Sequence, residues 1–448
     1  MKAFLRKYYT DLFLNRRLFI GLGVCVTLFV FSFFLSFLTD LPYFVFGMLI
    51  ILVFVDLLLL YRSEKAVFLR RDIPERLSNG DDNDIKIYLE NFYSFKVKIG
   101  IIDEIPVQFQ KRDLWFSTEL AVRENKTITY QLYPTRRGEY EFGQTRLYVQ
   151  SPLGLLSRRF NFGINKTVPV YPSFLKLRQY SLLAVSNRLT EIGLKKIRRV
   201  GHSMEFDQVK NYVAGDDYRT VNWKATARKG DLMVNAYTDE KAQHIYCVID
   251  KSRAMKMPFE GLSLLDYAIN ASLILSSVAL VKEDKAGLIT IAEKTGSIIP
   301  ADRKPTQLNR IMEVLYKEKT RYLESDMEAL YISIRATLKQ RSLVVFFSNF
   351  ESMSALERQL PFLKRIAKFH LLLVVFFENT TLKSLSQEPA KDIEGIYIKT
   401  IAEKFAYEKK LMVKELTKHG ILSLLTAPQN LTVNVVNEYL ALKARQRI

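Results

Sequence analysis

The chain has 448 residues, 48% of them apolar and 25% charged, and its 66 Lys and Arg against 47 Asp and Glu give a formal net charge of +19. This length predicts two to four domains, and 13 Pro with 18 Gly argue against a disordered or fibrous chain. Two cysteines are too few for a disulfide scaffold, and four scattered histidines disfavour a zinc enzyme. The positive charge predicts an acidic partner: a lipid surface, a nucleic acid or an acidic protein.

Two apolar runs near the N-terminus predict a membrane hairpin. Residues 18–39 contain no charged side chain, and residues 41–61 contain one, Asp56. Each run can cross a hydrocarbon core of about 30 Å as a helix of roughly 20 residues. Residues 1–65 are therefore expected to form a membrane anchor, in which Asp56 lies near a helix end and reaches the lipid headgroups. A functional carboxylate within the membrane is the alternative.

The charges that flank the hairpin predict its orientation. Lys and Arg residues precede the first run and follow the second, whereas the short connection between the runs has none. The positive-inside rule then places both ends of the hairpin in the cytoplasm. The soluble domains that follow are expected on the same side.

Residues 66–175 show the pattern of an all-β domain. Apolar and polar side chains alternate in residues 95–99, 105–109 and 128–132, and an alternation with a period of two is typical of half-buried strands. Turn signals separate these segments at the spacing of a β-sandwich. We therefore expect a β-sandwich domain next to the membrane.

Residues 243–448 alternate between strand and helix patterns, which predicts an α/β fold with a doubly wound parallel sheet. Ser263 is placed to cap one helix. The Phe pairs at 346–347 and 376–377 are interpreted as buried strand core, and the Lys-rich tract at 399–418 as a solvated helix face. The expected strands are residues 244–249, 286–291, 343–347, 369–377 and 421–425, and the expected helices are residues 264–281, 306–317, 326–340, 401–419 and 431–444.

A connector at residues 176–242 lies between these domains and carries basic, acidic and aromatic side chains in mixed order. Basic residues beside Tyr and Trp could hold single-stranded nucleic acid by charge and stacking. The interleaved carboxylates make nucleic acid an unfavoured partner. The preferred interpretation is a salt-bridged connector that packs the two domains together, with Trp223 as its buried anchor.

The connector contains a motif that resembles the signature of the bacterial domain of unknown function 58 family. The motif residues are Gly201, Glu205, Phe206, Tyr212, Gly215, Asp216, Arg219, Asn222, Trp223, Ala227 and Arg228. The resemblance extends to residues 137–140 and 151–155 upstream, and to residues 249–252 downstream, which look like the start of a von Willebrand factor A-like domain. A membrane anchor with two spans is common in this family, so the resemblance implies the bacterial inner membrane.

The family resemblance implies a partner more than an activity. Its members are commonly associated with MoxR-type AAA+ ATPases and with other A-domain proteins in protein complex assembly. This chain has no Gly-x-x-x-x-Gly-Lys-Ser/Thr motif of its own. We therefore expect a non-enzymatic, membrane-anchored adaptor or scaffold. The alternatives are a membrane-bound nucleic-acid-binding protein and an enzyme that uses residues 215–231.

Many A domains carry a metal-ion-dependent adhesion site, and here the resemblance implies a depleted version. Asp250 and Ser252 match its first loop, but Ala254 stands where a second Ser is needed. Ser325 is aligned with the Thr of the second loop, and Asn349 replaces the Asp of the third. Because Mg²⁺ requires nearly octahedral oxygen ligands, any ion would be bound weakly.

We expect no catalytic residue and no cofactor. Lys251 and Arg253 add positive charge near the depleted metal site, which further disfavours a cation. Asp250 is then a group that shapes its loop, or it pairs with Arg219 or Arg228 of the connector. The end of a first parallel strand still predicts a binding crevice, which would take a protein without a cation.

Overall fold

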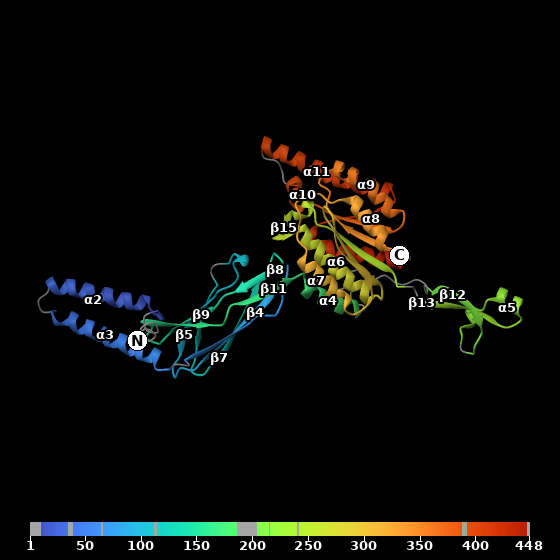
Figure 1. Cartoon of the computed structure of the whole chain (residues 1–448). Helices are drawn as coiled ribbons and strands as arrows, with labels where there is room; N and C mark the ends of the chain where they lie inside the picture. Colours follow the sequence, from blue (N-terminus) through green and yellow to red (C-terminus); the bar gives the residue numbers. More distant parts are fainter. Residues whose placement is uncertain are drawn as a thin grey trace. The chain divides into compact units, whose positions relative to one another are not determined.

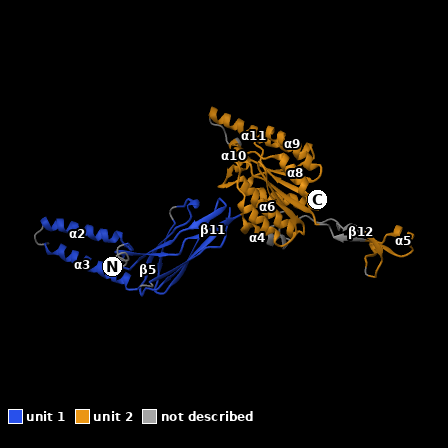
Figure 2. Cartoon of the chain, viewed as in Figure 1, with its two compact units in different colours: residues 1–171 blue, residues 172–448 orange. Residues whose placement is uncertain are grey.

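The computed structural model describes residues 10–34, 39–63, 66–111, 114–185, 204–214, 216–239, 242–387 and 392–445. The chain divides into two compact units, unit 1 with residues 1–171 and unit 2 with residues 172–448 (Figures 1 and 2). Unit 1 contains a helical hairpin and a β domain. Unit 2 contains the signature motif and an α/β sheet.

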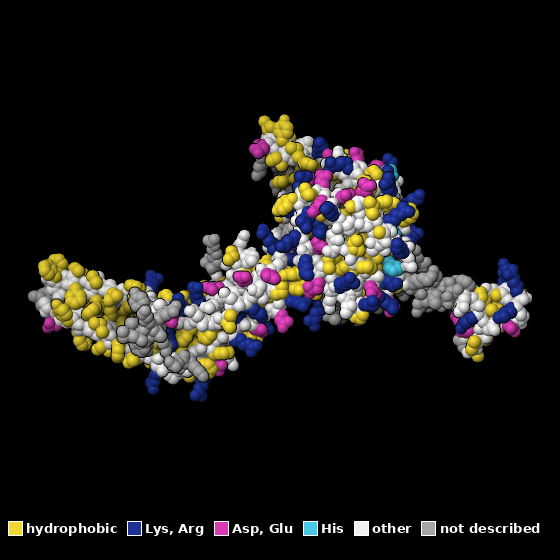
Figure 3. Space-filling model, viewed as in Figure 1, with side chains coloured by type: hydrophobic (Ala, Val, Ile, Leu, Met, Phe, Trp, Pro, Cys, Tyr) yellow, Lys and Arg dark blue, Asp and Glu magenta, His cyan; other side chains and the backbone are white. Residues whose placement is uncertain are grey.

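The helical hairpin of unit 1 consists of α2 (Arg16–Phe34) and α3 (Asp40–Tyr61), and both are long and apolar enough to cross a membrane. Their surface is mainly hydrophobic (Figure 3), which is consistent with the expected membrane association. A third helix, α6 (Leu264–Val281), meets the same criteria of length and composition. It lies in unit 2, and 78% of its apolar stretch is buried, as expected of a core helix.

Asp56 of α3 is fully buried against the turn that joins two strands of the β domain. Its Oδ2 accepts hydrogen bonds from the backbone N–H groups of Leu155 (2.9 Å) and Leu156 (2.8 Å), and its Oδ1 accepts one from the Ser151 hydroxyl. The prediction that this carboxylate reaches the headgroups is wrong, because the protein itself supplies three donors. Asp56 therefore fixes α3 to the turn formed by residues 151–156.

Further polar contacts join the hairpin to the β domain. The Arg17 guanidinium of α2 donates to the carbonyl of Leu153 at 3.0 Å. At the end of α3, the carbonyl of Leu60 accepts hydrogen bonds from the buried Arg158 guanidinium and from the Tyr93 hydroxyl, both at 2.8 Å. The hairpin and the β domain thus share buried hydrogen bonds at α3 and an exposed one at α2.

The β domain contains three sheets around one hydrophobic core. The first sheet has the order β1 (Leu12–Leu14), β10 (Leu156–Phe162), β9 (Thr145–Gln150), β5 (Val97–Asp103) and β6 (Trp115–Leu120). The second has β2 (Val67–Asp72), β4 (Asn83–Asn91) and β7 (Asn125–Leu132), and the third β3 (Leu77–Ser78), β11 (Lys166–Tyr171) and β8 (Gly138–Phe142). The expected strand at residues 105–109 is wrong, because residues 107–109 form a 3₁₀ turn between Pro106 and Gln110, whose φ of 53° is left-handed.

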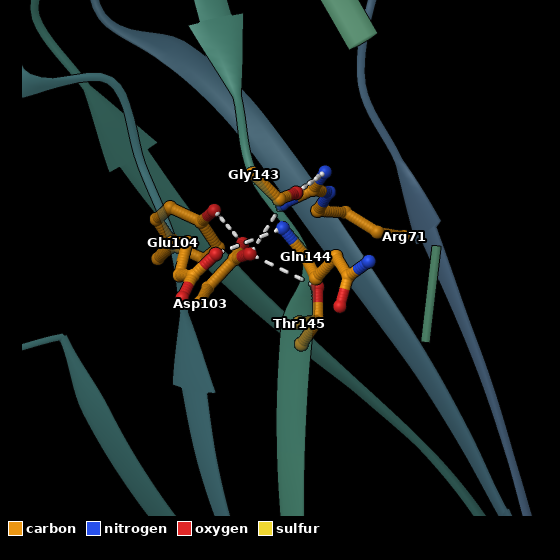
Figure 4. A network of polar contacts seen from close by, with 7 residues as sticks. Arg71, Asp103, Glu104, Gly143, Gln144 and Thr145 are labelled. Carbon is orange, nitrogen blue, oxygen red and sulfur yellow. Dashed lines mark hydrogen bonds and ion pairs between the residues drawn. The ribbon is translucent and has the colours of Figure 1, made fainter. Parts of the chain in front are cut away.

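A buried ion pair links two of these sheets (Figure 4). Arg71 of β2 lies 2.5 Å from the Asp103 carboxylate of β5 and also donates to the Gly143 carbonyl at 2.7 Å. Asp103 further accepts hydrogen bonds from the hydroxyls of Thr145 (3.0 Å) and Tyr130. Burial, together with the Asp103 charge, raises the pKa of the Tyr130 hydroxyl, so this group stays a donor.

Unit 2 contains a six-stranded sheet in the order β18 (Thr295–Asp302), β17 (Lys285–Ile291), β14 (His244–Asp250), β19 (Leu343–Phe347), β20 (Leu371–Phe377) and β21 (Leu422–Thr426). All neighbours are parallel except β18, which runs antiparallel to β17. The expected sheet was wholly parallel, so the mixed sheet is a correction. Only three residues join β17 to β18, and such a short connection permits an antiparallel hairpin but no parallel crossover.

Helices cover both faces of this sheet, because alternate side chains of its strands enter two separate hydrophobic clusters. One face packs against α6, α7 (Gln307–Lys317) and α12 (Leu431–Ala444), and the other against α8 (Met327–Thr337), α9 (Met353–Ala367) and α11 (Ile393–Lys418). Ser263 caps α6 in a capping box with Asp266, as predicted. Both Phe pairs are buried in strand core, also as predicted.

The remaining elements of unit 2 include α4 (Phe174–Val185), α10 (Thr380–Gln387), β15 (Pro258–Phe259) and β16 (Leu262–Ser263).

Replacing Asp56 should loosen the hairpin from the β domain. Asp56→Ala leaves the Ser151 hydroxyl and the N–H groups of Leu155 and Leu156 without their acceptor, at about 1–3 kcal/mol for each buried group that stays unpaired. We expect a clearly lower melting temperature of the full chain in mild detergent. The matched control is Asp84→Ala, which removes an exposed carboxylate of β4 that accepts only from Gln131 and should change stability by less than about 0.5 kcal/mol. Equal melting temperatures for the two variants would contradict the role given to Asp56.

Candidate functional site

The candidate site lies at the carboxyl edge of the parallel strands in unit 2. β14 is the first strand of this sheet along the chain and has β17 on one side and β19 on the other. The chain continues from β14 to β17 on one side of it, and later returns to β19 on the other side. The carboxyl end of β14 is therefore a topological switch point, where α/β sheets commonly bind ligands. Asp250 ends β14, and Ser348 and Asn349 directly follow β19.

Two serine hydroxyls contact the Asp250 side chain, and we call Asp250, Ser325 and Ser348 together the hydroxyl cluster. The Asp250 carboxylate is 2% exposed. It accepts hydrogen bonds from the Ser348 hydroxyl at 2.7 Å, from the Ser325 hydroxyl, and from the backbone N–H of Ser252 at 2.8 Å. The structure thus brings Asp250, Ser252 and Ser325 together as the sequence predicts, and it adds Ser348. The three donors surround the carboxylate, so Asp250 needs no pairing with Arg219 or Arg228.

Asn349 lies beside this cluster but faces a lysine. Its Nδ2 donates to the carbonyl of Ala254 at 3.3 Å, and its Oδ1 accepts from the Lys409 ammonium at 2.9 Å. Lys409 also donates to the Phe350 carbonyl at 2.5 Å. In a metal-ion-dependent adhesion site this position would supply an oxygen ligand to the cation. Here the Asn349 amide oxygen instead accepts a hydrogen bond from a lysine of α11.

Lys251 points to a second buried carboxylate. Its ammonium lies 2.6 Å from Glu318, whose other oxygen accepts from the hydroxyls of Thr290 (3.0 Å) and Ser297 (2.9 Å). The expectation that Lys251 adds free positive charge near Asp250 is therefore wrong, because Glu318 neutralises it. Removing one partner of such a buried pair is strongly destabilising.

These residues fit a magnesium ion poorly. Octahedral coordination needs about six oxygens that are free to face one point. Here Asp250 is taken up by its donors, the Asn349 oxygen by Lys409, and Ala254 has no side-chain oxygen. In the part of the chain that the structure describes, no group of three or more His, Cys, Asp or Glu side chains is placed to hold a metal.

An apolar cavity of about 200 Å³ opens next to Asn349 and Lys409. Its wall is formed largely by apolar side chains from the loop after η5 (Arg253–Lys256) and from β20, α10, α11 and β21, among them Phe259, Phe377, Leu382, Phe405 and Leu425. Lys383, Lys409 and Lys410 also line it, together with Glu351 and Glu378. Lys383 pairs with Glu378 at 3.1 Å. We call this space the edge cavity. It combines a hydrophobic wall with Lys409 and Lys410 at the switch-point end of the sheet.

Lys409 has an unusual protonation equilibrium. Burial lowers its pKa from the usual 10.5 to about 8, although the nearby Glu351 charge acts in the opposite direction. The unfolded chain therefore binds more protons between these two values, so this group's contribution to the free energy of unfolding increases as the pH rises from about 8 to 10.5. The interpretation of the whole 399–418 tract as a solvated face is wrong for Lys409, because an alternating charge pattern does not reveal which lysine faces a neighbouring strand.

The first turns of α11 extend beyond the neighbouring helices of unit 2 and carry exposed apolar side chains (Figures 1 and 3). The exposed fraction is 75% for Ile393 and 68% for Tyr397. Phe405, 42% exposed, also lines the edge cavity. Exposed apolar side chains of α11 thus precede the part of the helix that lines the cavity, and exposed apolar patches of this kind commonly mark interaction sites.

The signature motif forms a separate hairpin, which we call the signature hairpin. Its strands are β12 (Met204–Asn211) and β13 (Met233–Asp239), and its tip carries α5 (Trp223–Lys229). Asn222 caps α5 by accepting from the N–H of Ala225 at 3.0 Å, and it donates to the Asn235 side chain at 2.8 Å. This motif residue therefore has a structural role.

Asp216 is a second structural residue of the motif. It accepts from the Lys210 ammonium at 2.9 Å and from the N–H of Val213 at 3.1 Å. The Lys210 hydrogen bond, with help from the Val213 N–H, holds the pKa of Asp216 below its usual range. The carboxylate therefore stays ionised and ties the strand β12 to the turn that follows it.

Other motif residues lie on the surface of the signature hairpin. The prediction of Trp223 as a buried anchor is wrong, because its side chain is 71% exposed. Tyr212 is 37% exposed, and Arg228 is exposed at the end of α5. Arg219 lies over the Tyr218 ring, and Ala227 is exposed in α5. Glu205 and Phe206 belong to β12, whereas Gly201 and Gly215 lie outside the described residues.

Comparison with known proteins identifies the family. Residues 208–382, which begin within β12 of the signature hairpin and include Asp250 and Asn349 of the switch-point edge, match the family described as "Protein of unknown function DUF58". The match supports a DUF58 family member. A curated relative, "Uncharacterized protein YeaD" of Bacillus subtilis (strain 168), is 24% identical over 206 residues, which are 44% of this chain and 51% of the relative. The DUF58 chain thus spans about half the length of the curated relative it matches.

Solved structures resemble parts of this DUF58 protein only distantly. Conserved hypothetical protein BatB from Bacteroides thetaiotaomicron is 15% identical, with a TM-score of 0.30, over 46% of this chain and 100% of that one. The CARDB domain of the PF1109 protein from Pyrococcus furiosus, in complex with di-metal ions, is 12% identical, with a TM-score of 0.17, over 24% of this chain and 93% of that one. TM-scores this low do not establish a common fold.

The low pKa of Lys409 can be tested by its reactivity. With a trace of acetic anhydride at increasing pH, acylation of Lys409 should show an inflection near pH 8, whereas ordinary lysines show one near 10.4. Quantitative mass spectrometry of the Lys409 peptide from the full-length protein gives the profile. In the variant Glu351→Gln the inflection should move to lower pH, because the charge that favours the ammonium is removed. An inflection at the ordinary lysine value would refute the burial of this amine.

Proposed function

We propose that this DUF58 protein is a non-enzymatic, membrane-anchored adaptor whose α/β domain binds partner proteins at the switch-point edge. The observation that carries the proposal is the edge cavity, where an apolar wall lies next to Lys409 and where α11, which also exposes apolar side chains, contributes Phe405 to the lining. Such a surface suits a partner segment with an apolar side chain next to an acidic group.

A lysine takes the place of a metal ion in this proposal. A metal-dependent adhesion site binds a partner carboxylate through a bridging cation. Here the Lys409 ammonium already contacts the Asn349 oxygen next to the cavity, and it can attract a carboxylate without any ion. The proposed site therefore needs no Mg²⁺, and chelators should leave partner binding unchanged.

The fold assignments that belong to this proposal are a β-sandwich for the β domain and a von Willebrand A-like fold for the α/β domain. The common core of the sheets in unit 1 supports the first, and the helices on both faces of the sheet in unit 2 support the second. The expected partner is a MoxR-type AAA+ ATPase, together with other A-domain proteins, in complex assembly or maturation.

The proposed location is the bacterial inner membrane, with both termini and the soluble domains in the cytoplasm. Arg16 and Arg17 at the start of α2 and Arg62 after α3 lie at the same end of the hairpin, whereas Asp40 begins α3 at the opposite end. This distribution supports the orientation through the positive-inside rule.

The adaptor role can be tested by purifying the tagged full-length protein from mild-detergent membranes, after cross-linking, with and without ATP and Mg²⁺. We expect an AAA+ ATPase among the proteins identified by mass spectrometry. Phe405→Ser should reduce its recovery at least tenfold, since truncating an aromatic residue that is a binding hot spot costs about 2 kcal/mol or more.

The matched control is Tyr407→Ser, which changes a 60% exposed aromatic residue of the same helix that does not line the edge cavity. Recovery with this control should equal that of the wild type. The proposal fails if the wild-type protein recovers no ATPase, or if both variants lose the partner equally.

A further inference from the structure

A second cavity lies in unit 1, where the membrane hairpin meets the β domain. Its volume is about 360 Å³. We call it the basic cavity, and its lining includes Asn15, Arg16, Arg17, Lys96, Lys98 and Gln150. Residues of the turn that holds Asp56, including Ser151 and Gly154, complete its wall. The cavity is therefore built from both the membrane anchor and the β domain.

Positive charge dominates this cavity. Four cationic side chains line it against a single carboxylate, Glu119, which pairs with Lys96 at 2.5 Å. Among the described residues, Arg17 donates only to neutral carbonyl groups, and Arg16 forms no ion pair. Lys98 faces Glu119 across the neighbouring strand and interacts with its charge, but Glu119 forms its close ion pair with Lys96. One carboxylate is thus shared by two lysines, and within the described residues the two arginines have no acidic partner.

The Arg17 guanidinium is held in place before any ligand arrives. It donates to the Leu153 carbonyl at 3.0 Å, and a Cβ atom at Gly154 would lie only 3.0 Å from its Nη1. Gly154 also has a φ of +67°, which glycine adopts without strain. The backbone of the turn therefore favours glycine here, and the absence of a side chain leaves room for Arg17.

The position of the basic cavity matches the level of lipid headgroups. Arg16 begins α2, and Phe19 and Ile20, about 5 Å further along the helix axis, are 58% and 56% exposed. Exposed apolar side chains of a membrane helix face the acyl chains, so the phosphate layer lies next to the start of α2. Asp56 fixes α3 to the same turn and holds the β domain at this level.

We infer that the basic cavity binds the phosphate of an anionic phospholipid headgroup, with Arg16, Arg17 and Lys98 as its donors. Guanidinium groups bind phosphate oxygens through paired hydrogen bonds. The charges that remain unpaired in the cavity are complementary to an anionic leaflet. Bound lipid would bridge α2 and the β domain and so set the depth of the anchor. The inference is independent of the proposed protein partners.

Native mass spectrometry of the full-length protein tests this assignment. The protein is released from nanodiscs made of equal parts of phosphatidylglycerol and phosphatidylcholine, and the retained lipids are counted. We expect the wild type to retain phosphatidylglycerol preferentially. The double variant Arg16→Ala/Lys98→Ala should lose this preference about tenfold, because each basic residue near a membrane surface contributes to anionic lipid binding.

The matched control, Lys86→Ala/Arg136→Ala, removes the same charge from exposed positions that do not line the basic cavity. It should keep the wild-type preference, and equal melting temperatures of the two double variants show that both are folded. Equal loss of preference in both would mean non-specific attraction and would overturn the site.

A further experiment adds inorganic phosphate, which should not displace the lipid. Full displacement would assign the cavity to free phosphate instead and overturn the lipid assignment.

Discussion

The buried carboxylate of Asp56 is the constraint on which the arrangement of unit 1 depends. A charged group in an otherwise apolar helix is costly unless it is fully hydrogen-bonded, and here the turn at residues 151–156 supplies the donors. That requirement fixes the end of α3 against β10. The same turn also meets Arg17 of α2, so a single loop orients both membrane helices. The basic cavity is a consequence, since it forms where this turn, the start of α2 and the strand β5 meet.

Lysine ammonium groups play a comparable part at the switch-point edge of unit 2. Lys251 of the loop that follows β14 pairs with Glu318, and Lys409 contacts Asn349 after β19. Each takes an oxygen that a hard cation could otherwise use, and each is tethered to the chain, so the local charge does not depend on metal supply. A lysine is also a more adaptable centre than a magnesium ion, because its burial brings its pKa to about 8 and its charge can respond to a bound carboxylate. These contacts support the proposed binding of partner proteins without a cation.

Local patterns predicted much of the fold, whereas the sites depended on contacts that no local pattern contains. The apolar runs predicted α2 and α3, and continuous apolar segments predicted β14, β19 and β20, because burial on both faces leaves a clear signal. The antiparallel β18 was missed, since its direction follows from a three-residue connection and not from composition. Asp56 and Lys409 were each interpreted as solvated. Their partners lie about 100 and 60 residues away in the chain, and periodicity within one helix cannot indicate such a neighbour. Asp250, Ser252 and Ser325 could be grouped in advance only through the family resemblance.

The motif that identifies the family is not the part of the chain best suited to bind a ligand. Asn222 and Asp216 use their side chains to cap α5 and to close a turn, so they stabilise the signature hairpin itself. Trp223 and Tyr218 of that hairpin face outward instead, and each is more than 70% exposed. A short hairpin cannot bury such rings on its own, because it has no second layer to pack against. Recognising the motif thus identifies a fold element. The cavities to which we assign binding lie elsewhere, at Lys409 and at the start of α2, on residues that the motif does not include.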